Sequence, residues 1–327
     1  MYTGFYNLRE KPFEITPDPR FLYLSENHKE GLAHLQYAVK ERRGFTVITG
    51  EVGTGKTTLV QTLLSRLDGT TRTAYLFNPK MGPNDFLQYI CDDLGVKGSI
   101  RTKREAISEL HKFLLECHRR NENVVLIVDE AQNLDRQLLE EVRLLTNLET
   151  AKNKLLQVIL IGQPELNDVL NDSKTRALKQ RVGLRYHIKP LNRDETHEYI
   201  KVRLKRAGAI DANIFTPKAV DLIYRYSKGI PRSINIVCDN ALLNGYASDQ
   251  KVIGEEIIKD VIRTLEGPET VKNRKGLILL VLGVGLVVGF AAVLWWRPEL
   301  LRGLKEGAAQ FVEKLEDLMA SISRLIR

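Results

Sequence analysis

Apolar residues follow a succession of different patterns along the chain. Up to about residue 190, short runs of β-branched and apolar residues alternate with stretches in which apolar residues recur every three or four positions. The first pattern is typical of buried strands and the second of helices. From 191 to about 268 only the helical spacing is found, and an uncharged run at 276–296 and a tail at 297–327 follow. The pattern predicts an α/β domain at 1–190, an all-helical domain at 191–268 and two further segments.

Five strands and four helices are predicted within the first of these domains. The strands are expected at 44–49, 73–77, 123–128, 156–161 and 184–188. The helices are expected at 27–41, 59–64, 83–94 and 103–119. Residues 1–26, the lead-in, place aromatic residues among prolines without a regular period. We expect the lead-in to be irregular and to pack on the first domain. Its aromatic residues are Tyr2, Phe5, Tyr6, Phe13, Phe21 and Tyr23.

A phosphate-binding pattern, G-x-x-x-x-G-K-[ST], lies between the first predicted strand and a following helix. Its glycines let backbone N–H groups turn inward around a polyphosphate, and the helix N-terminus adds a positive dipole end. The Lys56 side chain can reach the β- and γ-phosphates, and the Thr57 hydroxyl can ligate Mg²⁺. A chance glycine-rich turn would rarely satisfy every specified position in this context. We therefore predict an ATP and Mg²⁺ site that includes Gly50, Val52, Gly53, Thr54, Gly55, Lys56, Thr57 and Thr58.

Two carboxylates follow the apolar run at 123–128. Adjacent carboxylates after a strand can be an ordinary solvated strand end, but a phosphate loop upstream favours the second half of an ATPase site. In that interpretation Asp129 holds Mg²⁺ through water, and Glu130 orients and polarises the attacking water. Gln163 follows the strand at 156–161, where a polar residue senses the γ-phosphate in such enzymes. The alternative for Gln163 is a simple turn residue.

Arginines at two places are candidates for completing the site. Arg181 precedes the strand at 184–188, where arginines commonly reach the ATP of a neighbouring subunit. Arg176 and Arg185 are rivals for this role, and each of the three taken alone is more commonly a surface charge. Arg232 stands in a Gly-x-Pro-Arg turn that leads into a helix, from which it can swing toward the γ-phosphate as a lid closes.

Composition and charge say less about the function and location of the protein than the motifs do. A net charge of +8 permits an acidic partner without requiring one. The three cysteines are isolated, which fits a reduced cytosolic domain and gives no zinc-ligand spacing. Residues 1–11 contain no apolar signal-peptide core, so we expect no export of this end.

A membrane span is predicted at 276–296. These 21 uncharged residues would form a helix about 30 Å long, close to the thickness of the hydrocarbon core. A buried core helix of this length would usually carry a polar face. The flanking residues fit an interface on either side: Lys272, Arg274 and Lys275 before the span, and Trp295, Trp296 and Arg297 at its end. We expect a single-pass inner-membrane protein with a cytoplasmic ATPase domain and a periplasmic tail.

The tail is predicted to form a short amphipathic helix. Its apolar residues alternate three and four apart, as in a heptad seam. The seam consists of Leu301, Leu304, Ala308, Phe311, Leu315, Leu318, Ile322 and Leu325. The opposite face carries Glu306, Glu313, Glu316 and Asp317, which anionic lipid would repel. We expect packing with other chains, and a membrane-lying helix or a partner-docking helix is the alternative.

Several motifs together resemble the AAA+ ATPases, and more narrowly the general secretion pathway component A (ExeA-like) ATPases. The resemblance covers about 1–266 and rests on the segments at 5–19, 44–53, 128–132, 161–166 and 180–187. It implies an α/β P-loop NTPase (AAA+) fold, with a parallel sheet sandwiched by helices and an all-α lid. It also assigns the roles described above to Lys56, Thr57, Asp129, Glu130, Gln163, Arg181 and Arg232. Secretion members carry a peptidoglycan-binding domain beyond the membrane, where this chain has only 297–327.

The expected function is ATP hydrolysis that drives assembly or remodelling of a cell-envelope system, related to secretion, pili or exopolysaccharide. A homo-oligomer, such as a ring, and an envelope protein partner are implied, while the client and the ring size stay open. The alternative is a nucleic-acid-linked switch of the transposition-helper or initiator type, although no DNA-binding module is visible. That switch would use a basic strip of Lys174, Arg176, Lys179, Arg181 and Arg185. A scaffold that binds ATP without hydrolysing it is a third possibility, against which Glu130 argues.

Overall fold

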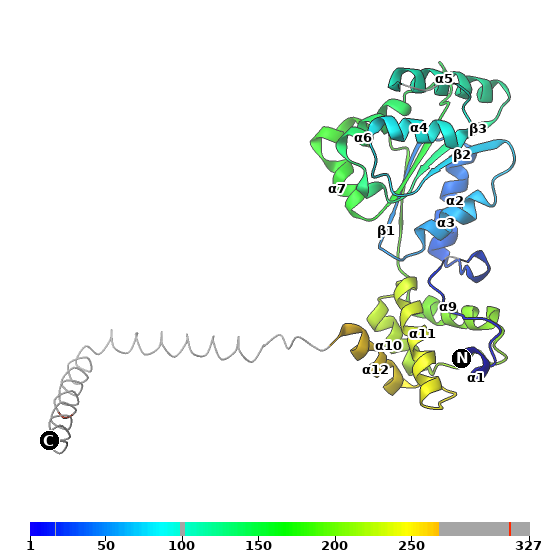
Figure 1. Cartoon of the computed structure of the whole chain (residues 1–327), viewed down its shortest axis with the longest axis vertical. Helices are drawn as coiled ribbons and strands as arrows, with labels where there is room; N and C mark the ends of the chain where they lie inside the picture. The colour runs from blue at the N-terminus through cyan, green and yellow to red at the C-terminus, as the bar shows by residue number, and fades with distance from the viewer. Residues whose placement is uncertain (17, 99–101, 268–313, 315–327) are drawn as a thin grey trace, which may run out of the picture. The chain divides into compact units, whose positions relative to one another are not determined.

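The computed structural model describes residues 1–16, 18–98, 102–267 and 314 (Figure 1). Residues 1–265 form one compact unit. Within this unit we call residues 26–190 the sheet half and residues 191–265 the helical half. The predicted domain division at 190/191 falls between the last strand and the first helix that follows it.

The sheet half is built on five parallel strands in the order β2-β3-β4-β1-β5. Every predicted strand is confirmed, with ends that differ by at most two residues. The register aligns Val47 of β1 with Leu160 of β4 on one side and with Arg185 of β5 on the other. The strands are β1 (Phe45–Gly50), β2 (Thr71–Leu76), β3 (Asn123–Val128), β4 (Gln157–Gly162) and β5 (Leu184–Ile188).

Helices cover both faces of the sheet because its central strands bury side chains in both directions. Leu126 of β3 lies in a core with five helices, and Ile127, the next residue, lies in a second core with two others. The first group consists of α4 (Pro83–Leu94), α5 (Lys103–Arg119), α6 (Arg136–Leu145), α7 (Glu165–Asn171) and α8 (Arg176–Lys179). The second group consists of α2 (Glu26–Lys40) and α3 (Lys56–Leu64). The predicted α/β fold with helices on both faces is confirmed, whereas α6, α7 and α8 were not predicted.

The helical half contains four helices, in agreement with the helical spacing of its apolar residues. Its first helix begins with a capping box, in which Asn192 and Glu195 bond to each other's backbone N–H groups. One isolated bridge, between Phe215 and Ile253, joins two loops. The helices are α9 (Arg193–Arg206), α10 (Pro217–Ser227), α11 (Pro231–Ala247) and α12 (Glu255–Glu266). The remaining short elements are α1 (Tyr2–Phe5), η1 (Pro19–Phe21), η2 (Ala131–Asn133) and η3 (Ser173–Thr175).

The lead-in packs on the helical half, so the prediction that it packs on the nucleotide-binding domain is wrong. Tyr2, Tyr6 and Phe13 are buried in one core with α9, α10, α11 and α12. The Phe13 ring meets the Phe215 ring edge to face at 6.1 Å between centroids. The physical reason is that the helices of this half leave an apolar surface that the aromatic side chains fill. Without a period, these side chains gave no indication of their partner.

No helix in the described part of the chain is both long and apolar enough to cross a bilayer. The predicted span at 276–296 lies outside the described residues. The predicted amphipathic tail at 297–327 does so too, apart from Lys314.

Candidate nucleotide-binding site

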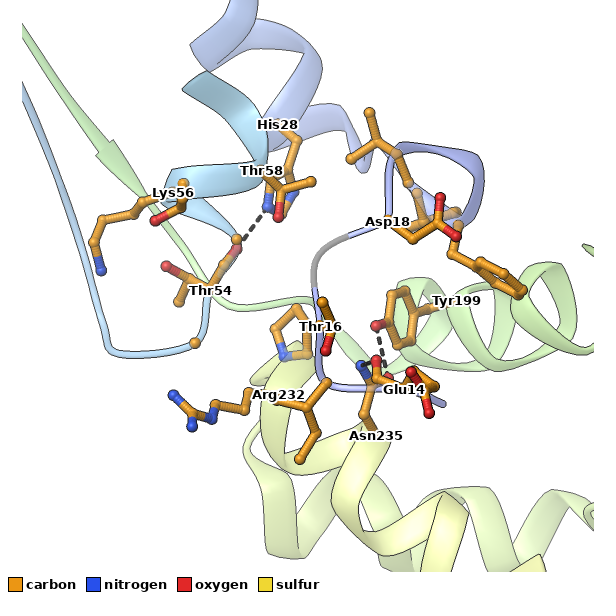
Figure 2. A pocket seen from close by; sticks show the side chains of 18 of the residues that line it. Glu14, Thr16, Asp18, His28, Thr54, Lys56, Thr58, Tyr199, Arg232 and Asn235 are labelled. Carbon is orange, nitrogen blue, oxygen red and sulfur yellow. Dashed lines mark hydrogen bonds between the residues drawn. The ribbon is translucent and has the colours of Figure 1, made fainter. Parts of the chain in front are cut away.

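The phosphate loop, residues 51–55, connects β1 to α3 and therefore has the strand–loop–helix context that the motif requires. It borders a cavity of about 490 Å³. Figure 2 shows the loop, with Thr54 and Lys56, on one side of this cavity, and Arg232 and Asn235 of α11 on the other. Residues 14–16 of the lead-in run between the two sides and also line the cavity. The size and the loop suit a nucleotide.

Lys56 is the first residue of α3 and is buried. Its Nζ donates hydrogen bonds to the carbonyl oxygens of Gly50, at 2.8 Å, and Glu51, at 2.9 Å. Burial lowers the pKa of Lys56, while the nearby carboxylates of Glu130 and Asp129 favour its charged form. The ammonium group thus lies at the loop, held by two carbonyl groups that a phosphate can replace.

Thr57 and Asp129 are brought together at the carboxyl edge of the sheet. The Thr57 hydroxyl donates to Asp129 Oδ2 at 2.8 Å, and the Tyr75 hydroxyl donates to the same oxygen at 2.9 Å. Burial, with Asp129 beside it, raises the pKa of Tyr75, which keeps this hydroxyl protonated as a donor. A hydroxyl and a carboxylate are the oxygen ligands that Mg²⁺ prefers, so the donor set fits that ion. The sequence analysis did not identify Tyr75 as a site residue. Its position on β2 is the one feature that could have indicated this role.

Glu130 follows Asp129 and adopts a left-handed backbone conformation, with φ of 53°. Its Oε2 accepts hydrogen bonds from the side-chain amides of Gln132 and Gln163, the latter at 3.3 Å. The Gln132 side-chain oxygen in turn accepts from the backbone N–H of Gln163 at 3.0 Å. The structure therefore places Gln163 next to Glu130. Gln132, which connects the two, had no role in the sequence prediction.

Arg232 reaches the cavity because a turn fixes the start of α11. Gly229 in that turn has φ of +75°, and a Cβ there would lie 1.8 Å from the carbonyl oxygen of Leu191. Leu191 N–H donates to Gly229 O at 2.9 Å, which ties the turn to the start of the helical half. Two residues into the helix, Arg232 N–H donates to Gly53 O at 3.3 Å. The Gly-x-Pro-Arg pattern thus positions Arg232 against the phosphate loop.

Arg181 lies elsewhere. Its Nη1 donates to the Thr146 hydroxyl at 2.8 Å, just beyond the end of α6, and it does not line the cavity. Its rivals Arg176 and Arg185 are both exposed. The structure thus brings Lys56, Asp129 and Glu130 together but does not bring Arg181 to the cavity of its own chain.

His28 is a third residue that sequence reasoning missed. It lies on α2, is 5% exposed and lines the cavity. Its Nε2 lies 2.8 Å from Thr54 O of the phosphate loop, and its Nδ1 lies 2.7 Å from the Ser25 hydroxyl. Burial lowers the pKa of His28, so the imidazole is neutral at pH 7. Nothing in the hydrophobic pattern distinguishes this histidine from an ordinary helix residue.

Comparison with known proteins identifies relatives of this chain. Residues 39–170 match the AAA domain family. General secretion pathway protein A of Aeromonas hydrophila is 41% identical over 298 residues, which cover 90% of this chain and 54% of that protein. An uncharacterized HTH-type transcriptional regulator of Methanocaldococcus jannaschii is 22% identical over 250 residues, which cover 72% and 60%. The chain thus spans little more than half the length of these curated relatives.

Solved structures share the fold at low identity. The ORC2 protein of Aeropyrum pernix, in its ADPNP–ADP complexes, superposes with a TM-score of 0.58 at 17% identity, covering 77% of this chain and 71% of that one. A chain of Drosophila ORC bound to DNA gives a TM-score of 0.63 at 18% identity, covering 83% and 68%. Likeness at this identity shows the α/β P-loop fold.

Proposed function

We propose that the chain is an AAA+ ATPase, similar to general secretion pathway protein A, that drives assembly or remodelling of a cell-envelope system from the inner membrane. In this proposal the cavity beside the phosphate loop binds ATP. The sheet half supplies the groups that act on the phosphates, and the helical half closes over them.

One observation carries the proposal for the site. Lys56 and Thr57 begin α3, and Asp129 and Glu130 directly follow β3. These four residues meet beside the phosphate loop, although 72 positions separate Thr57 from Asp129 along the chain. A structural ion pair would not need a hydroxyl, a carboxylate and an ammonium group bonded only to backbone carbonyl groups at one loop. Nucleotide hydrolysis needs all three.

ATP binding changes the partners of Lys56. Its Nζ leaves the carbonyl oxygens of Gly50 and Glu51, which it bonds in this structure, for the β- and γ-phosphates. The exchange is favourable because a phosphate oxygen carries more negative charge than a carbonyl oxygen. Thr57 and Asp129 would hold Mg²⁺, which supplies neutralisation of phosphate charge when bound.

Glu130 orients the attacking water and accepts a hydrogen bond from it. Its second carboxylate oxygen is bonded to Gln132 and Gln163, so the carboxylate is held while one oxygen stays available. Gln163 lies beside Glu130 and is the γ-phosphate sensor in this scheme. Arg232, at the start of α11, donates to the γ-phosphate from the helical half.

Arg181 is proposed to act on the ATP of a neighbouring chain. Its position away from its own cavity is compatible with that role, and the bond to Thr146 would be exchanged for the neighbour's phosphate. Arg176 and Arg185 stay rivals because both are exposed. A homo-oligomer, such as a ring, follows from a site completed in trans.

The envelope role and the membrane anchor rest on sequence. The relative from Aeromonas hydrophila carries a secretion name, and the uncharged run at 276–296 fits a membrane span. We propose a cytoplasmic ATPase domain and a periplasmic tail, since ATP is cytosolic. A periplasm-active reporter fused after Arg327 should therefore be active, and activity only of a cytosolic reporter would contradict this orientation.

The site is tested with two variants of the full chain that separate binding from turnover. Lys56→Ala should abolish ATP binding, because it removes the charge that neutralises the phosphates. Glu130→Gln should bind ATP normally and block phosphate release. Glu41→Gln is the matched control, since that carboxylate is exposed and lies outside both the cavity and the phosphate loop. Full turnover by Glu130→Gln would rule out the assigned role.

Mixing variants tests the role in trans. Arg181→Ala chains and Lys56→Ala chains each lack a different half of a shared site, so a mixture should regain some hydrolysis. Co-assembly is checked by differential tags. Co-assembled chains without any regained activity would show that Arg181 is the wrong residue or that the site is not shared. Stimulation of hydrolysis by DNA, rather than by envelope extracts, would instead favour the nucleic-acid alternative.

A further inference from the structure

The carbonyl groups of the phosphate loop need hydrogen-bond donors of their own. A loop that turns its N–H groups inward must turn carbonyl groups outward, and buried carbonyl groups are rarely left unpaired. Gly53 O accepts from the backbone of Arg232 at 3.3 Å. Thr54 O, in a residue with no exposed surface, accepts from His28 at 2.8 Å. The donor to Thr54 is thus a side chain from α2, an element outside the motif.

The orientation and the tautomer of His28 are fixed by Ser25, the N-cap of α2. The Ser25 oxygen accepts from the His28 backbone N–H at 3.3 Å, and its hydroxyl lies 2.7 Å from His28 Nδ1. Since Thr54 O can only accept, His28 Nε2 carries the hydrogen, and Nδ1 accepts from the Ser25 hydroxyl. One serine therefore caps the helix and aims the imidazole N–H at the loop. Figure 2 shows the His28 imidazole bonded to Thr54.

Holding Thr54 O also sets the direction of the next N–H group. In a trans peptide the C=O of one residue and the N–H of the next point in opposite directions across one plane. With Thr54 O directed at His28, the Gly55 N–H is directed away from His28. The ring also lies close over Gly55, where an added Cβ would be 3.3 Å from Nε2. With φ of +93°, Gly55 gives this peptide its backbone freedom, and His28 restricts it.

We propose that His28 is a positioning residue of the phosphate loop: its Nε2–H holds the Thr54 carbonyl group so that the Gly55 N–H faces the β-phosphate of a bound nucleotide. This inference rests on the proposed nucleotide site. It gives a function to a buried histidine that takes no part in the hydrolysis scheme. If His28 only filled space, any side chain of similar size could replace it without weakening nucleotide binding.

The test compares two replacements of equal length in the full chain. His28→Gln keeps an N–H donor that can reach Thr54 O, and His28→Met does not. Both lose the ring, so only the donor differs between them. We expect His28→Met to bind ADP about tenfold more weakly than His28→Gln, the value of one hydrogen bond of about 1.4 kcal/mol. The two should bind AMP equally, because AMP lacks the β-phosphate. The same pair of replacements at His34, a half-buried histidine on the same helix that does not line the cavity, is the control.

Equal ADP affinity in the two variants would overturn the proposal, and so would an equal loss for ADP and AMP. If a variant does not fold, the proposal can still be tested in the unmodified chain, by measuring the ¹⁵N resonances of the His28 ring. They should report the Nε2–H tautomer and shift with ADP more than with AMP, and an Nδ1–H tautomer would overturn the proposal. Lys56→Ala tests the proposed nucleotide site separately from the role of His28. ADP binding by Lys56→Ala would contradict the site itself. Equal ADP affinity of the two His28 variants would contradict only the role of His28.

Discussion

The two walls of the cavity are built in different ways. The sheet half presents charged and hydroxyl groups at the carboxyl edge of the sheet, such as Thr57 at the start of α3 and Asp129 after β3. The helical half instead holds a piece of irregular chain. Arg203 on α9 is buried, and its guanidinium group donates to Pro12 O at 2.5 Å, to Glu14 O at 3.2 Å and to the Tyr199 hydroxyl at 2.9 Å. The wall from the sheet half thus carries reactive polar groups, and the wall from the helical half holds the lead-in by hydrogen bonds.

The contrast shows how two kinds of contact build one site. Groups that act on phosphate are placed by strand ends, whose alignment in a parallel sheet is rigid. The lead-in that covers the cavity has no such alignment, and side chains about 190 positions away fix its path. Arg203 forms no ion pair among the described residues, so backbone carbonyl groups and the ring of Phe21, 5.0 Å from its Cζ, take the place of a carboxylate. We expect the structure of the wall from the helical half to depend on packing, and that of the wall from the sheet half to depend on charge.

Removal of the Phe13 side chain should give the largest loss of stability. Phe13 is 1% exposed, and Phe13→Ala should lower the free energy of unfolding by about 3–5 kcal/mol through lost burial and a cavity. Native-state hydrogen exchange should show the loss of protection in α9 to α12 rather than in β1 to β5. Phe77→Ala is the control, because Phe77 is 61% exposed and its loss should change stability by less than about 0.5 kcal/mol. Protection lost equally in the strands would mean that the lead-in supports both halves alike.

Sequence reasoning succeeded where a pattern has a period or a fixed spacing. The strands, α4 and α5 follow from apolar periodicity, and the cluster of Lys56, Thr57 and Asp129 follows from spacing around strand ends. The partner of the lead-in could not be predicted, because its aromatic residues have no period and contact helices distant in sequence. His28 and Gln132 could not be found either. The role of His28 depends on a hydrogen bond to Thr54, and that of Gln132 on bonds to Glu130 and Gln163; such individual contacts leave no repeated pattern in the sequence.

Changes at Arg203 should have the next largest effect. Arg203→Met leaves the Pro12 carbonyl group without its donor and the Glu14 carbonyl group with only the 3.4 Å bond from Asn235, and it should cost about 2–3 kcal/mol of unfolding free energy. Arg203→Lys keeps the charge but not the planar fork, so it should recover only part of that loss. Denaturant unfolding measures both. If Arg203→Lys behaves like the unmodified protein, charge rather than the two directed hydrogen bonds holds the lead-in.

Acidification should affect the two halves in different pH ranges. In the sheet half, burial lowers the pKa of His28 below its ordinary value of 6.5. In the helical half, a hydrogen bond from Arg193, helped by His197, lowers the pKa of Asp221 from 3.8 to about 2. The contribution of Asp221 is present above pH 3.8 and is lost as the pH falls toward 2. The contribution of His28 should be lost at higher pH, before that of Asp221.

The sign for His28 follows from counting protons. Between pH 6.5 and the lower pKa of the folded state, the unfolded chain binds more protons, so the free energy of unfolding falls as the pH falls. One group gives a slope of at most about 1.4 kcal/mol per pH unit, the smallest effect of the three over a single unit. His28→Gln removes the titrating group but keeps a donor, so urea unfolding between pH 7 and 5 should show a shallower slope for this variant. Asp221→Asn should instead lower stability at neutral pH, and this difference from the unmodified protein should disappear as the pH falls from 3.8 toward 2. An unchanged slope in His28→Gln would assign the titration to another histidine and remove the proposed difference between the halves.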